Sequence, residues 1–209
     1  MNKSYTLFIS FIVALGGFLL GFDSAVISGA VSGIRTYFEM SDWELGFSVG
    51  CVIFGAMVGN ISAGPMSDRF GRKSILIVTA MLFTVSALWS AFATTYVTFV
   101  VARIIGGIGI GGAILIAPIY IAEIAPPKLR GSLVSLNQLN IVIGISVAYF
   151  SNYFLKDLEG ESWRWMLGVE AIPAFLYFVA LFAVPRSPRW LIQKLNLVEI
   201  ARKTLVKIG

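Results

Sequence analysis

Six long apolar runs, separated by short polar gaps, constrain the fold of this chain more than any other feature. They cover residues 5–30, 43–63, 74–93, 97–121, 132–154 and 165–184. A helix needs about 20 residues to cross the ~30 Å hydrocarbon core of a bilayer. Each run is therefore predicted to be a transmembrane helix, and the chain is predicted to be an all-α membrane protein with six spans.

The composition also indicates a membrane protein and argues against other classes. Of the 209 residues, 57% are hydrophobic and 13% are charged, whereas a soluble domain carries about 25% charged residues. The net charge of +5 does not indicate a nucleic-acid partner, because the basic residues lie in the gaps between apolar runs, where they set membrane topology. The chain has no His and one Cys, Cys51, so no metal site and no cofactor are predicted.

The distribution of basic residues predicts the orientation in the membrane. Six spans place both ends of the chain on one side, and most of the 16 Lys and Arg residues fall there; the opposite gaps contain only Arg35, Lys156 and Arg164. Loops rich in Lys and Arg stay in the cytoplasm, so both termini are predicted to be cytoplasmic. Residues 1–184 are predicted to form the bundle, and the basic, amphipathic residues 185–209 to form a surface helix that begins a cytoplasmic linker.

One cytoplasmic gap, residues 64–73, is short, basic and bounded on both sides by apolar runs. It begins with Gly64-Pro65, which is a turn signal. The segment is therefore predicted to be a hairpin loop at the membrane surface, between the second and third spans.

Three ionisable residues lie inside the predicted spans: Asp23, Arg103 and, near the outer start of the sixth span, Glu170. Each costs at least ~2.5–3.5 kcal/mol to insert and is a functional candidate for that reason. At 1.5 Å per residue, Asp23 and Arg103 lie about 10 Å and about 9 Å from the outer ends of their spans. They can therefore pair if the first and fourth spans are neighbours.

Two interpretations of an Asp23–Arg103 pair stay open at this point. An Asp that binds and releases a proton beside an Arg is what a proton-coupled carrier needs. A static ion pair that only fixes helix packing is the alternative. The glycine-rich sequence around both residues, which lets helices bend, favours the first interpretation.

The fifth span carries three amide side chains within four residues: Asn137, Gln138 and Asn140. An amide both donates and accepts hydrogen bonds, which suits a polyhydroxylated ligand, but amides also bond one membrane helix to another. Gln138 points about 100° away from its neighbour Asn137, so the three cannot share one direction. Gln138 is the better candidate for a ligand contact, and Asn137 for a contact between helices.

A series of short motifs runs along nearly the whole chain. The first are Gly-Phe-Asp at 21–23, Val-Ile-Ser-Gly at 26–29, Gly64-x-x-x-Asp68-Arg69-Phe70-Gly71-Arg72-Lys73, and Arg103-x-x-x-Gly107-x-Gly109-x-Gly111. The others are Pro118-x-Tyr120-x-x-Glu123, Ala125-Pro126, Arg130-Gly131, Asn137-Gln138-Leu139 with Ile141 and Gly144, Trp163-Arg164-x-Met166, and Pro185-x-Ser187-Pro188-Arg189-Trp190-Leu191. In this order the motifs resemble those of the sugar porters of the major facilitator superfamily.

The resemblance implies one half of the major facilitator fold, a 3+3 inverted repeat of helices, in the plasma (inner) membrane. It implies that Asp23 binds the coupling proton with Arg103 as its partner, and that Gln138 and Ile141 contribute to the sugar site. The proton gradient would then be the energy source. The resemblance also implies a network that keeps the cytoplasmic side closed in the outward-facing state. Its residues are Gly64, Asp68, Arg69, Gly71, Arg72, Glu123 and Arg130.

The chain departs from the family pattern in two respects. Arg186 stands where the family has an acid, and the motifs match only the first six of the family's twelve spans. Because alternating access rocks one bundle against another, the expected partners are a second six-helix bundle, a sugar or polyol, and the lipid bilayer.

The predicted function is transport of a sugar or polyol across the membrane, as half of a proton-coupled symporter. Two alternatives stay open: a half-size carrier that works as a homodimer, and a non-transporting sugar sensor or truncated remnant. The chain is not predicted to be an enzyme, because it has no His and no clustered nucleophile and base.

Overall fold

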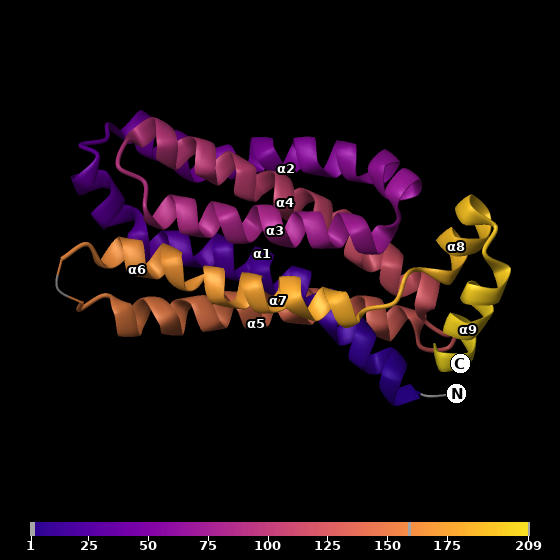
Figure 1. Cartoon of the computed structure of the whole chain (residues 1–209). Coiled ribbons are helices and arrows are strands. Elements are labelled where there is room, and N and C mark those ends of the chain that lie inside the picture. Colours follow the sequence, from indigo (N-terminus) through magenta and orange to yellow (C-terminus); the bar gives the residue numbers. More distant parts are fainter. Residues whose placement is uncertain (1–2, 159, 209) are drawn as a thin grey trace.

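The computed structural model describes residues 3–158 and 160–208, which form an elongated bundle of helices (Figure 1). The helices of the bundle are α1 (Lys3–Tyr37), α2 (Asp42–Phe70), α3 (Arg72–Ala91), α4 (Tyr96–Ile124), α5 (Arg130–Leu155), α6 (Ser162–Val169) and α7 (Ala171–Ala183). Two short helices follow, α8 (Pro188–Leu195) and α9 (Val198–Ile208). Among the described residues, six helical segments are long and apolar enough to cross a membrane, and α6 and α7 together form the sixth, Ser162–Ala183.

The packing of the spans follows an inverted repeat. The most extensive contacts between helices are those of α1 with α5 and of α2 with α4. If each of the first three spans is exchanged with the span three places later, the pair of the first and fifth spans becomes the pair of the fourth and second. The two pairs are therefore equivalent under the repeat. The contacts thus agree with the 3+3 inverted repeat that the resemblance implies.

A close backbone approach joins α1 to α5. A Cβ atom built at Gly21 would lie 2.0 Å from the carbonyl oxygen of Ile141, so only glycine fits at this position. Small residues of this kind let membrane helices pack closely, since van der Waals contact rather than hydrophobic burial drives their association in lipid.

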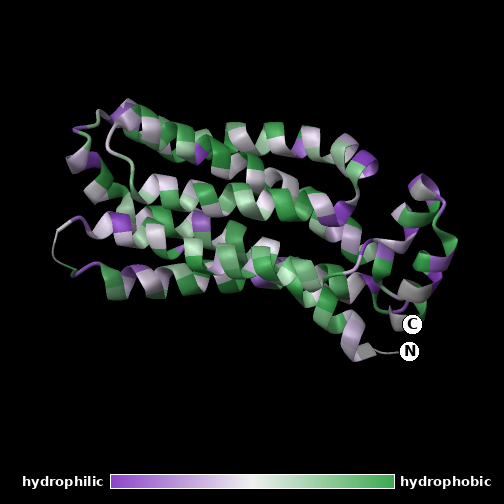
Figure 2. Ribbon diagram, viewed as in Figure 1, coloured by the Kyte–Doolittle hydropathy of each residue, from purple (hydrophilic) through white to green (hydrophobic). Residues whose placement is uncertain are grey.

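The polar ends of the bundle fit a membrane orientation. Hydrophobic residues cover most of the long helices, whereas hydrophilic residues gather at both ends and on α8 and α9 (Figure 2). The start of α1 lies at the same end of the bundle as α8 and α9 (Figure 1). At the opposite end a capping box starts α2: the Ser41 backbone N–H donates to the Glu44 carboxylate (2.9 Å), and the Glu44 N–H donates to the Ser41 hydroxyl (3.3 Å).

The helix ends differ from those predicted in three places. α1 continues past residue 30 to Tyr37, so Arg35 lies in its last turn and pairs with Asp42 at 2.7 Å. α2 continues through Pro65 to Phe70, so the predicted loop over residues 64–73 is wrong, and Gly71 alone separates α2 from α3. Residues 185–209 contain two helices rather than one, because Asn196 adopts a left-handed conformation (φ 52°, ψ 27°) that ends α8.

Candidate functional site

Asp23 on α1 and Arg103 on α4 form a buried ion pair inside the bundle. Nη1 of Arg103 donates to Oδ1 of Asp23, and Nη2 donates to Oδ2 at 3.3 Å. Only 4% of each residue is exposed. A bidentate arrangement of this kind is the strongest form of a charge-assisted hydrogen bond. The first and fourth spans are thus neighbours, and the two charges meet as their matching depths predict.

Glu170 joins this pair from the sixth span. It is 2% exposed and lies at the break between α6 and α7, where Pro173 has no backbone N–H to offer the Val169 carbonyl. Its carboxyl lies close enough to Asp23 and Arg103 to interact electrostatically with both. The structure therefore assembles a cluster of two acids and one base from three spans.

The charges of this cluster balance only when it holds one proton. With both carboxyls ionised, Asp23 and Glu170 carry one negative charge more than Arg103 neutralises. Burying an uncompensated charge is costly in a low-dielectric interior. Within the described part of the chain, Nε of Arg103 and Oε1 of Glu170 have no hydrogen-bond partner, so the cluster retains both donor and acceptor capacity.

The amides of α5 separate into two groups, as predicted from their spacing. Asn137 and Asn140 are buried, whereas Gln138 is exposed. The backbone and side-chain oxygens of Asn137 press against Gly17 of α1. Asn137 therefore belongs to the α1–α5 contact and is not available to a ligand in the open face.

Gln138 is exposed on α5, beside the stripe of residues that contacts α1. Ile141, half-buried, packs its backbone against α1 at Gly21 and lies one turn further along α5. Gln138 and Ile141 thus border an open face of the bundle. An exposed amide there keeps its full donor and acceptor capacity for a hydroxylated ligand.

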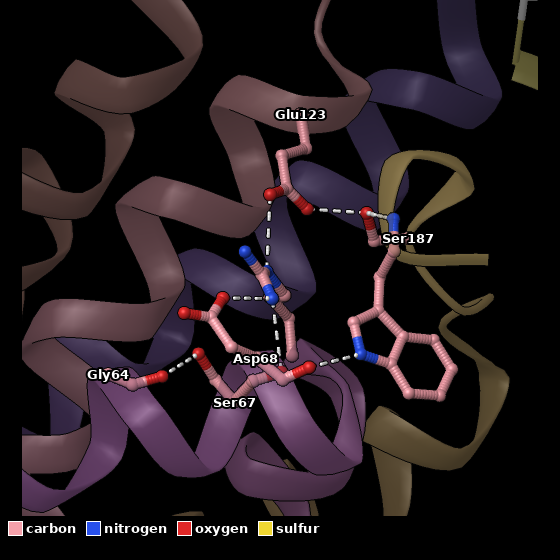
Figure 3. A network of polar contacts seen from close by, with 7 residues as sticks. Gly64, Ser67, Asp68, Glu123 and Ser187 are labelled. Atoms are coloured by element: carbon pink, nitrogen blue, oxygen red, sulfur yellow. Dashed lines mark hydrogen bonds and ion pairs between the residues drawn. The ribbon is translucent and has the colours of Figure 1, made fainter. Parts of the chain in front are cut away.

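Arg72 is the centre of a polar network at the end of the bundle near α8 (Figure 3). Its Nε donates to Glu123 at 3.1 Å, and its Nη1 donates to the Ser67 carbonyl at 3.0 Å and pairs with Asp68 at 2.8 Å. Ser67 in turn donates to the Gly64 carbonyl at 2.9 Å. One guanidinium therefore ties the end of α2 to the end of α4.

The same network holds α8 against the bundle. The Ser187 hydroxyl donates to Glu123 and also accepts the Trp190 backbone N–H at 3.4 Å, which caps the first turn of α8. Nε1 of Trp190 donates to the Asp68 carbonyl at 3.0 Å. The α2–α3 junction, α4 and α8 are thus connected through shared partners (Figure 3).

Gly71 forms the sharp turn between α2 and α3 beneath the Trp190 ring. Its φ of 92° lies in a region that residues with a side chain rarely adopt, and a Cβ there would lie 3.2 Å from the indole. Both the backbone and the available space therefore require glycine at this position.

Two residues predicted for the network do not reach it. Arg69 is exposed and stacks on the Phe70 ring at 5.2 Å, and Arg130, at the exposed start of α5, makes no ion pair with any residue that the structure describes. Because α2 stays helical to Phe70, Arg69 points about 100° away from Asp68. The basic partner of Glu123 is consequently Arg72.

The motif positions and their geometry agree with the comparison to known families. Residues 9–209 match the family model described as "Sugar (and other) transporter". The chain belongs to this sugar transporter family. Its relatives include a glucose transport protein of Synechocystis sp., 45% identical over 91% of this chain, and the arabinose-proton symporter of Bacillus subtilis, 40% identical over 100% of it.

Solved structures in the sugar transporter family show the same fold. The chain superposes on the proton:xylose symporter XylE bound to 6-bromo-6-deoxy-D-glucose with a TM-score of 0.94 and 38% identity, over 100% of this chain and 50% of XylE. The chain spans less than half the length of the curated relatives, 43% of the Synechocystis protein and 46% of the Bacillus one. These relatives are transporters and not enzymes, as predicted, and the chain is a multi-pass membrane protein.

The structure adds three residues to the sites predicted for this sugar transporter family member. Glu170 was identified as a charge within a span, but its sequence position gives no sign that it meets Asp23. Ser187 and Trp190 belong to a matched motif, and the Ser-Pro pair at 187–188 is a helix-start signal. Their contacts with Glu123 and Asp68 depend on how α8 folds back under the bundle.

Proposed function

We propose that this chain is the amino-terminal half of a proton-coupled transporter of a sugar or polyol. The observation that carries the proposal is the buried cluster of Asp23, Arg103 and Glu170 in a bundle of the sugar transporter family. A merely structural pair needs one acid for one base. Because a second acid is buried here, the cluster is neutral only when one of its two carboxyls is protonated.

In this proposal Asp23 binds and releases the coupling proton. Arg103 contacts both oxygens of Asp23 when the acid is ionised. Protonation weakens that contact and frees the guanidinium. The proton gradient is the energy source, and the chemistry requires no cofactor.

Gln138 and Ile141 form this chain's part of the sugar site. The exposed amide of Gln138 hydrogen-bonds sugar hydroxyls, and Ile141 offers an apolar surface one turn away. Named relatives carry glucose, arabinose and galactose, which supports a pentose, hexose or polyol as the substrate class.

The Arg72 network acts as the cytoplasmic gate. Asp68, Arg72 and Glu123 join α2 to α4, and Gly64 and Gly71 shape the chain around them. The exposed Arg69 and Arg130 contact the second bundle in the state that closes the cytoplasmic side. Arg186, which replaces the family's acid, lies 6.0 Å from the Trp190 ring and adds positive charge beside this gate.

A second six-helix bundle completes the path. α2 and α5 are the least buried of the six spans, and α2 presents one continuous apolar face with the exposed side chains of Phe54, Met57 and Ile61. These faces pack against the partner bundle. Both termini are cytoplasmic, and the protein lies in the plasma (inner) membrane, in agreement with the basic residues near α8 and α9.

Uptake into proteoliposomes tests the proposal. The chain is reconstituted alone and together with a six-span partner bundle, and uptake of labelled pentoses, hexoses and inositols is measured with and without a pH gradient. Uptake of a sugar that the gradient raises above equilibrium supports the proposal. Absence of uptake and of sugar binding in both preparations would contradict it and favour an inert remnant.

The same preparations separate the alternatives. Uptake by the chain alone, with efficient cross-linking of a cysteine placed at Gln138 to a second copy, would favour a homodimeric carrier. Since Cys51 is the single cysteine and is buried, a Cys51→Ser background leaves only the introduced thiol. Sugar binding without uptake in any preparation would favour a sensor.

A further inference from the structure

A long groove runs between α3 and the helices α6 and α7, which lie side by side (Figure 1). The part nearer the α5–α6 connection has a volume of about 520 Å³, and its continuation toward the membrane centre has about 380 Å³. Both parts are lined by Leu88, Gly168 and Ile172, so they form one continuous groove. Asp23, Gln138 and the Arg72 network do not line it.

The groove forms because small residues line its floor and large side chains line its walls. A Cβ built at Gly168 would lie 3.3 Å from the Cβ of Ala91, so α6 and α3 meet at these two small residues. The walls are large, exposed apolar side chains, namely Leu88, Phe92, Trp165, Ile172, Phe175 and Leu176. Large apolar walls around a narrow floor suit a hydrocarbon chain.

Charged groups occur at one end of the groove only. Glu161 and Arg164 pair there, at the end of the bundle opposite α8 and α9 (Figure 1). Nη1 of Arg164 donates to the carbonyls of Ala91 (2.7 Å) and Ala93 (2.8 Å), which fixes the guanidinium at the end of α3. The Glu161 carboxylate, 44% exposed, stays accessible beside it.

The length and direction of the groove match one leaflet of a bilayer. At 1.5 Å per residue, the rim at Arg164 and the far wall at Leu176 are about 18 Å apart. Half of the ~30 Å hydrocarbon core is about 15 Å. The groove also runs along the helices and therefore parallel to the acyl chains of a membrane.

We propose that this groove binds a zwitterionic phospholipid of the leaflet opposite the termini. One acyl chain lies over Ala91 and Gly168, and the headgroup sits at the rim with its phosphate near Arg164 and its ammonium near Glu161. The paired rim charges complement the two charges of such a headgroup better than they complement an anionic lipid. The site is independent of the sugar path, and it leaves the apolar face of α2 free for the partner bundle.

Photolabelling tests the proposal. The chain is reconstituted in vesicles of phosphatidylglycerol that contain a trace of phosphatidylethanolamine with a diazirine in its acyl chain. The expected result is adducts concentrated on the peptides that contain Leu88, Gly168 and Ile172, and saturated by unlabelled phosphatidylethanolamine. Adducts spread evenly over all lipid-facing helices, with no saturation, would overturn the proposal.

Two variants refine the test. Leu88→Trp with Ile172→Trp fills the groove and is expected to lower labelling several-fold, whereas Val85→Trp, on the same helix but outside the groove, is expected to leave it unchanged. An equal loss of labelling in the groove-filling variant and in Val85→Trp would overturn the proposal. Glu161→Gln is expected to reduce the preference for phosphatidylethanolamine over phosphatidylglycerol. Should the filled variant fail to fold, saturation of labelling in the unmodified chain decides the question.

Discussion

Arg103 is the single side chain whose loss is expected to destabilise the protein most. Arg103→Leu leaves Asp23 and Glu170 buried without a counter-charge, and removing one partner of a buried ion pair costs about 3–5 kcal/mol. The variant is expected to unfold at a markedly lower temperature in detergent. The double variant Asp23→Leu with Arg103→Leu, which removes both partners, is expected to recover most of the stability that Arg103→Leu alone loses. If Arg103→Leu alone were as stable as the unmodified chain, the ion pair between Asp23 and Arg103 would be contradicted.

Gln138 is expected to affect sugar binding without affecting folding. The residue is exposed, so Gln138→Ala is expected to disturb little packing within the bundle. Loss of a hydrogen bond to the sugar costs about 1.4 kcal/mol, which corresponds to about tenfold weaker binding. Leu139→Ala, the exposed neighbour on the same helix, is the matched control. Sugar dose–response curves measure the difference, and equal affinity in Gln138→Ala and the control would exclude Gln138 from the site.

Individual contacts could be predicted from sequence where one geometric rule decides them. Asp23 and Arg103 were paired correctly because two charges at equal depth in neighbouring helices meet. Glu170 could not be added, since its place beside them depends on the break before Pro173 and on the tilt of the sixth span. Arg72 was included in the predicted network and lies at its centre, whereas Arg69, predicted with it, is exposed and stacks on Phe70 instead, because α2 stays helical beyond Pro65.

Among the helices, the α2–α3 junction depends on Gly71. Gly71→Ala forces a φ of 92° on a residue with a side chain and presses its Cβ on the Trp190 ring, at a cost of about 1–3 kcal/mol for the backbone alone. The junction is expected to loosen, so trypsin is expected to cleave faster at Arg69 and Arg72. Gly131→Ala, where a Cβ meets nothing within 4 Å, is the control and is expected to change nothing. Unaltered cleavage in Gly71→Ala would contradict a strained turn.

The attachment of α8 depends on Ser187. Ser187→Ala removes both the hydrogen bond to Glu123 and the cap of the first turn, and the loss of such a cap costs about 1 kcal/mol. Amide hydrogen exchange is expected to increase in residues 188–195 and not in the spans. Ser135→Ala, an exposed serine that bonds only its own helix, is expected to leave exchange in α8 unaltered. Full protection of α8 in Ser187→Ala would show that other contacts hold it.

The existence of the helices was predictable from sequence, but their ends were not. Hydropathy identifies the part of a helix that lies in hydrocarbon, because only that part must be apolar. α1 continues to Tyr37 and α2 to Phe70, beyond the apolar runs. Contacts with distant segments help to hold the end of α1, where Ile34 is buried and Tyr37 packs against Trp163. At Pro65 the helix continues in spite of a residue that usually ends one, so the turn signal misled the prediction.

Taken as one unit, the bundle has two faces with different expected partners. The least buried helices, α2 and α5, border the open face that carries Gln138, and the groove between α3 and the sixth span opens elsewhere on the bundle. The repeat and the family could be predicted from the order of the motifs. The assembly of Asp23, Arg103 and Glu170 from three spans and the link from α8 to Glu123 required the structure, because both depend on contacts between distant segments.

The proposed role of Asp23 in proton coupling is tested most directly by sugar accumulation in proteoliposomes under an inward proton gradient. The chain is reconstituted with a six-span bundle as the proposed partner, with either Asp or Asn at position 23. Asn cannot release a proton, so Asp23→Asn is expected to abolish accumulation above equilibrium while sugar exchange across the membrane continues. Accumulation by Asp23→Asn equal to that of the unmodified chain would contradict the account.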